Sequence, residues 1–170
     1  MKRLVFALAV VIASGSAALY ARQQQQQQQP PTWEQAAFNT WKGLHDKILA
    51  MAKDTQFPDD KLSWKPHPDS RSVLDEFRHV TIGLEMVTAQ LSGTPFNYME
   101  RVKADESKPK TRASVVAEME AAYARSLEVV KSSVKPNILF WLDHQGEHYG
   151  KLVSNYRMNN IVPPVSRPRK

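Results

Sequence analysis

The chain has 170 residues and a mass of 19.3 kDa, a size that suggests one domain, and its 42% hydrophobic residues and mean hydropathy of -0.48 indicate a soluble globular protein. It has no Cys, which excludes disulfides, zinc–thiolate fingers, iron–sulfur clusters and a cysteine nucleophile. The net charge of +6 comes from basic residues at the two ends, since residues 23–166 hold equal numbers of basic and acidic residues. Without a clustered basic stripe, no nucleic-acid partner is expected.

Residues 1–21 have the pattern of a secretory signal peptide. Lys2 and Arg3 precede an apolar run over residues 4–13, and residues 14–21 are rich in small side chains. The run is half of the roughly 20 apolar residues that a membrane span needs. The sequence therefore predicts cleavage, no stable membrane span afterwards, and export to a bacterial periplasm or exterior. An uncleaved N-terminal anchor is the alternative.

Residues 22–31 contain seven consecutive Gln followed by Pro30 and Pro31, and they offer no apolar face to bury. We interpret them as a flexible tether. The folded domain is expected over residues 32–166, followed by a basic tail at residues 167–170.

Four amphipathic helices are predicted in the domain, each with apolar residues at spacings of three and four. The first covers residues 32–53, with Thr32 as its N-cap, and the second starts at Ser70 or Ser72 and ends at Gly93. The apolar positions of these two helices are Trp33, Ala37, Trp41, Leu44, Ile48 and Met51, and then Val73, Phe77, Val80, Leu84, Val87 and Leu91.

The third helix is expected to start after Thr111 and to stop before Pro136, and the fourth to run from Asn137 to residues 159–160. Their apolar faces contain Val115, Met119, Ala122, Leu127 and Val130, and then Ile138, Trp141, Gln145, His148, Leu152 and Tyr156. Strand signals are nearly absent. The predicted fold class is all-α, a four-helix bundle, and the long connection over residues 92–111 allows the second and third helices to run parallel.

Two of the five His stand out by their spacing. His144 and His148 are four residues apart in the fourth helix, so they project from one face and can bind one metal ion. Such pairs also arise by chance at a core edge or in solvent, and the pattern differs from that of zinc proteases because Gln145 follows the first His.

A third ligand would strengthen this interpretation, and His79 in the second helix is the candidate. Gly83, one turn further along, would leave room for an ion or substrate. A lone His within a helix is more commonly a core-edge residue. His67, in a Pro-rich loop, and His45, beside an apolar stripe, are less suitable.

Four segments together resemble the DinB-like superfamily, which includes bacillithiol-transferase-like proteins. They are residues 64–72 (WKPHPDSRS), 77–80 (FRHV), 143–152 (DHQGEHYGKL) and 156–164 (YRMNNIVPP). The similarity covers about residues 33–166.

The resemblance implies a bundle with up-down-down-up topology and a divalent metal held by His79, His144 and His148. An export signal and a Gln tract depart from the basic family pattern, and they argue against transfer of a cytosolic thiol.

Zn²⁺ or Ni²⁺ held by three neutral imidazoles would keep open positions, where a bound water becomes a hydroxide near neutral pH or a thiol binds as thiolate. Two function classes stay open, of which the first is a metal-dependent enzyme, a hydrolase or thiol transferase of unknown small-molecule substrate. The alternative is a non-catalytic exported bundle that binds metal or a partner. An open pocket would favour the enzyme, and a site sealed by Trp33, Trp41 or Trp141 the alternative. A homodimer stays open.

Other polar groups near the three His carry less signal. Asp75, Glu76 and Asp143 are candidates to orient the imidazoles, but ordinary solvated carboxylates are the favoured interpretation. Tyr149 and Tyr156 are interpreted as packing residues. No residue is assigned a catalytic role from the sequence.

Overall fold

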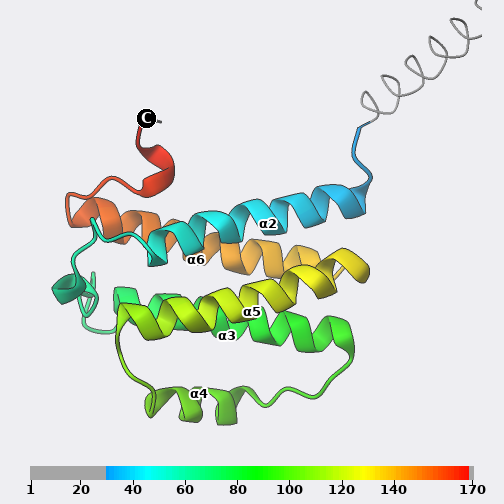
Figure 1. Cartoon of the computed structure of the whole chain (residues 1–170), viewed down its shortest axis with the longest axis horizontal. Coiled ribbons are helices and arrows are strands. Elements are labelled where there is room, and N and C mark those ends of the chain that lie inside the picture. Colours follow the sequence, from blue (N-terminus) through cyan, green and yellow to red (C-terminus); the bar gives the residue numbers. More distant parts are fainter. Residues whose placement is uncertain (1–29, 169–170) are drawn as a thin grey trace, which may run out of the picture. The chain divides into compact units, whose positions relative to one another are not determined.

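The computed structural model describes residues 30–168, and this part of the chain is all-helical, with five α-helices, two short 3-10 helices and no strands (Figure 1). The α-helices are α2 (Trp33–Ala52), α3 (Val73–Ser92), α4 (Tyr98–Glu106), α5 (Arg112–Ser132) and α6 (Ile138–Met158). The 3-10 helices are η1 (Asp59–Lys61) and η2 (Pro164–Ser166). The predicted signal peptide, most of the tether and the last two residues lie outside the described residues.

The all-helical prediction is confirmed, and the four long helices correspond to the four predicted ones. No helix within residues 30–168 is long and apolar enough to cross a membrane.

Local hydrogen bonds explain where the helices begin and end. The Ser72 hydroxyl accepts from Asp75 N and starts α3, and the Thr111 hydroxyl accepts from Ser114 N and starts α5. Gly93 ends α3 with a φ of 71°, a left-handed conformation that glycine adopts without strain. Asn137 occupies the N-cap of α6, but its side chain makes no capping hydrogen bond.

The predicted apolar faces form the core, with three differences, one of which is that Leu44 of α2 is only partly buried. All six predicted apolar positions of α3 are buried, and so are those of α6. In α2 the first position, Trp33, is 47% exposed because it lies at the helix end. In α5 the buried position is Ser126, while Leu127 is only partly buried. Ser126 accepts a hydrogen bond from Trp41 Nε1 at 3.1 Å, which satisfies both groups in the core.

The helix α4 was not predicted, and it fills the long connection between α3 and α5 (Figure 1). It has no buried residue, so it lacks the apolar stripe that reveals a helix in a sequence. Charge holds it instead: Arg101 donates to Glu85 of α3 at 2.5 Å and to Glu118 of α5 at 3.2 Å. The buried Arg78 of α3 donates to the Asp105 and Pro109 carbonyls at 3.1 and 3.0 Å.

Contacts between helices place α3 and α6 side by side. Both α3 and α2 pack against α5 and α6, and α3 packs most extensively against α5. The two helices that carry the candidate ligands are therefore neighbours in the bundle. The up-down-down-up order of the long helices stays a prediction.

Candidate metal centre

Three imidazoles from two helices meet between α3 and α6. His79 comes from α3, and His144 and His148 come from α6, one turn apart. One nitrogen of each lies within 4.8 Å of the others, and the ring of His148 lies 4.5 Å from each of the other two rings, measured between centroids. The spacing of His144 and His148 predicted a shared face, and the packing of α3 against α6 adds His79. Three His this close could hold a metal ion.

A buried carboxylate orients one of the three rings. His148 Nδ1 donates to Glu76 Oε1 at 2.5 Å, and both residues are 3% exposed. The bond fixes the tautomer and leaves Nε2 of His148 free to bind an ion, the arrangement of many metal-binding His. The prediction that Glu76 is a solvated carboxylate is wrong, because α3 is buried on this side as well as along its apolar stripe.

Burial keeps two of the imidazoles neutral. It lowers the pKa of His79 to about 4, with a further lowering from the charge of Arg71. Burial also lowers the pKa of His144 below its ordinary value, and the neighbouring His148 adds to the effect. Burial raises the pKa of Glu76, but the hydrogen bond from His148 and the charges of His148, Arg71 and Lys151 together hold the pKa below its ordinary value. Neutral imidazole is the form that binds metals.

The residues fit a divalent ion on two observations. His144 Nδ1 is buried and has no hydrogen-bond partner among the described residues, an arrangement that is costly unless a further group satisfies it. Three imidazole nitrogens are also a donor set that Zn²⁺ and Ni²⁺ accept, with positions left over for other ligands.

Gly83 makes room for a side chain of the protein. A Cβ at this position would lie 2.5 Å from Nε2 of Gln145. The Gln145 amide is fully buried and donates to the Val80 carbonyl at 3.3 Å. The predicted space beside Gly83 is therefore taken up by Gln145 where the two helices approach, although Gly83 also lines a cavity.

Cavities adjoin the cluster. The first, here called the histidine cavity, has a volume of about 420 Å³ and is lined by His79, Gly83, Met86, Gln90, Tyr98, Phe140, Trp141 and His144. A second, the bridging cavity, has about 380 Å³ and includes His79, Tyr98 and Arg71 in its lining. Trp141 stacks on His144 at 5.7 Å without filling the histidine cavity. Neither Trp33 nor Trp41 lines these two cavities.

The two remaining His lie elsewhere. His45 is 2% exposed, hydrogen bonds through Nδ1 to the Trp41 carbonyl at 2.8 Å, and packs on the Trp41 ring. His67 is in the exposed segment before α3, with Nδ1 3.6 Å from an Asp69 carboxylate oxygen. Both are outside the cluster.

The other polar residues considered from the sequence, Asp75, Asp143 and Tyr156, do not belong to the His cluster. Asp75 accepts from the Ser72 hydroxyl at 2.6 Å, at the start of α3, and Asp143 is exposed. Tyr156 is buried and donates to the Met51 carbonyl at 2.7 Å, which agrees with a packing role. The sequence reasoning missed Arg71 and Tyr98, because neither belongs to a helical stripe.

Comparison with known proteins bears on the same region. The DinB superfamily pattern matches residues 48–152, more than half of the chain and the part that contains all three clustered His. No curated protein matches the chain. The all-helical fold, the His cluster and this match lead to one conclusion: the chain belongs to the DinB superfamily.

Proposed function

We propose that this protein binds one divalent ion, Zn²⁺ or Ni²⁺, through His79, His144 and His148, and that it works as a metal-dependent hydrolase or thiol transferase on a small molecule. The observation that carries the proposal is the convergence of three ligand nitrogens within 4.8 Å beside an open cavity. The cavity favours an enzyme over a non-catalytic bundle, because a substrate can reach the cluster.

The residues around the proposed ion would have different roles. When bound, the ion supplies a Lewis acid with open positions that activates water or a thiol. Glu76 holds the His148 ring in one orientation through the Nδ1 bond. Trp141 and Phe140 pack their rings against His144, at 5.7 and 5.9 Å, and line the histidine cavity with largely apolar surface. That surface would exclude bulk water from one side of a bound substrate.

Two further proposals rest on the sequence and the fold. Export is supported by the charged and apolar pattern of residues 1–21. The intact mass of the protein purified from cells tests it, because cleavage would lower that mass by the mass of the N-terminal segment. The up-down-down-up order is supported by Figure 1, in which the sequence colours run in the same direction along α3 and α5. Distances between labels attached at the ends of α3 and α5 test that order.

Metal analysis tests the central proposal. Full-length protein purified without chelator is expected to contain about one divalent ion per chain, since one cluster of three His is present in the described residues. A chelator should remove the ion, and added Zn²⁺ or Ni²⁺ should restore it and raise the melting temperature. A chain that takes up neither ion would end the proposal.

A second prediction concerns Glu76. Replacing it with Gln keeps its size and removes the charge that holds His148 in place. Metal affinity, measured by competition with a chelating dye, is expected to fall about 10- to 100-fold. The matched control is Glu147→Gln, one residue before His148 but exposed. Equal losses in the two variants would show that general charge, and not the bond to His148, sets the affinity.

A further inference from the structure

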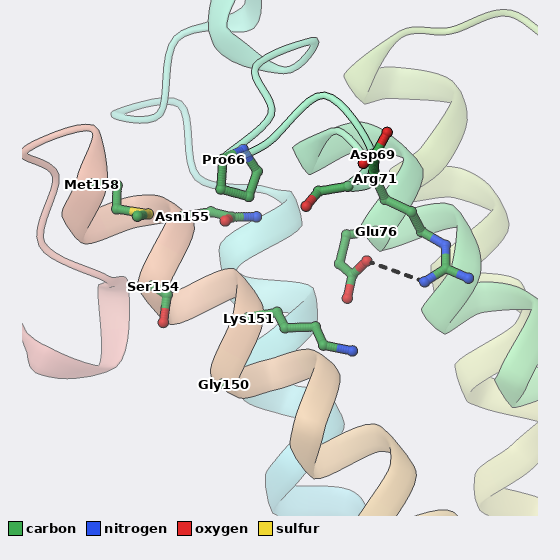
Figure 2. A pocket seen from close by; sticks show the side chains of 10 residues that line it. Pro66, Asp69, Arg71, Glu76, Gly150, Lys151, Ser154, Asn155 and Met158 are labelled. Carbon is green, nitrogen blue, oxygen red and sulfur yellow. Dashed lines mark ion pairs between the residues drawn. The ribbon is translucent and has the colours of Figure 1, made fainter.

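The largest of the cavities adjoining this site lies beside Glu76, between the segment before α3 and the C-terminal half of α6 (Figure 2). Its volume is about 770 Å³, and we call it the arginine cavity. Two cationic side chains line it from different parts of the chain: Arg71 from the segment before α3, and Lys151 from α6. Ser154 and the buried Asn155 add neutral polar surface.

The two cations are available to a ligand. Arg71 Nη1 lies 3.8 Å from Glu76 Oε2, which is beyond hydrogen-bond distance, and the Arg71 side chain is 45% exposed. Lys151 makes no ion pair with another described residue, although its charge, like that of Arg71, helps to lower the pKa of Glu76. Glu76 already accepts from His148 through its other oxygen. Asp69, the remaining carboxylate of the lining, is 92% exposed and therefore strongly screened by water.

Arg71 also connects this cavity with the His cluster. It lines the bridging cavity as well, and His79 is another lining residue of that cavity. Glu76, in turn, lines the arginine cavity and binds His148. A molecule whose anionic end contacts Arg71 can thus extend through the bridging cavity to His79, one of the three clustered His.

We propose that the arginine cavity is the part of the substrate site that recognises a carboxylate, so that the substrate is a small molecule with a carboxylate group bound by Arg71 and Lys151 and a reactive group facing the His cluster. Arginine presents a planar fork that matches a carboxylate with two hydrogen bonds, and a nearby ammonium adds charge. The inference rests on the proposed metal-dependent function and adds the substrate class to it.

The test compares two probes that differ in the anionic group. Full-length protein loaded with Co²⁺ is titrated with acetohydroxamate, which has a neutral tail, and with succinic acid monohydroxamate, which carries a carboxylate. Both bind an accessible metal through the hydroxamate, and the cobalt absorption spectrum reports binding without any assay of activity. The wild type is expected to bind the carboxylate probe about tenfold more tightly, the scale of one charge-assisted hydrogen bond.

The double variant Arg71→Gln, Lys151→Gln is expected to lose this preference, to within about twofold, while its affinity for acetohydroxamate stays unchanged. Lys131→Gln is the matched control, since Lys131 is an exposed residue of α5, which contributes no lining residue to the arginine cavity. It should keep the full preference.

The outcomes separate the two proposals. A chain that takes up no Co²⁺, or a loaded chain that does not bind acetohydroxamate, overturns the proposed function and this inference with it. A loaded chain that binds both probes equally, or a preference that survives in the double variant, overturns the carboxylate site alone.

Discussion

Replacing His148 with Ala is expected to remove the bound metal, with a loss of affinity of more than about 100-fold. His148 supplies one of three clustered nitrogens, and Glu76 fixes its orientation. The variant therefore loses one proposed ligand and also its hydrogen bond to Glu76. Loss of a carboxylate that only orients a ligand already costs about 10- to 100-fold, and loss of the ligand itself should cost more. Metal content after dialysis, measured by elemental analysis, checks the result.

The variant needs a companion because it leaves the Glu76 carboxylate buried without its partner, which destabilises a fold. His144→Ala removes a second ligand and keeps the pair of Glu76 and His148 intact. Both variants should lose the ion, and thermal melting should show that His144→Ala stays folded. His67→Ala, in the exposed segment before α3, is the control that should retain the ion. Wild-type metal content in both variants would refute the three-His site.

Replacing Trp41 with Ala is expected to lower the free energy of unfolding by about 3 to 5 kcal/mol. Trp41 has no exposed surface, its ring lies 4.1 Å from that of His45, and its Nε1 donates to the buried Ser126 hydroxyl. The change would open a cavity between α2 and α5 and remove a core hydrogen bond. Since domains of this size are stable by about 5–15 kcal/mol, the variant would lose a large part of its stability.

Urea denaturation measures this effect, with Trp33→Ala as the matched control from the same helix. Trp33 is 47% exposed, and its removal should cost less than about 1 kcal/mol. Trp41→Phe, which keeps an aromatic ring and loses the bond to Ser126, should fall between the two. Similar losses for Trp33 and Trp41 would contradict the packing described for α2.

The helices were predictable because their signals are local. Ser72, Thr111 and Gly93 act on backbone groups within a few residues, so their effect on helix ends can be recognised without a tertiary structure. The apolar stripe of α3 likewise repeats with the helical period. The helix α4 lacked such a signal: it is held by Arg101, whose partners Glu85 and Glu118 lie in two other helices.

The candidate site was predictable in part for the same reason. His144 and His148 share a helical face by spacing alone, whereas His79 is brought to them by the packing of α3 on α6. The sequence favoured a solvated Glu76, because a carboxylate in the first turn of a helix is usually exposed. Glu76 is buried because the fold brings it into contact with His148, which lies 72 residues further along the sequence.

Taken by itself, the sequence determined the helical class, the end of α3, the start of α5, the resemblance to the DinB superfamily and a pair of candidate metal ligands one helical turn apart. Only the tertiary structure decided that Glu76 is buried against His148, that Gln145 packs against Gly83, and that cavities lined by His79 and Arg71 adjoin the cluster. The physical reason is range: capping and periodicity act over a few residues, whereas burial, long-range hydrogen bonds and cavities exist only once distant helices have packed together.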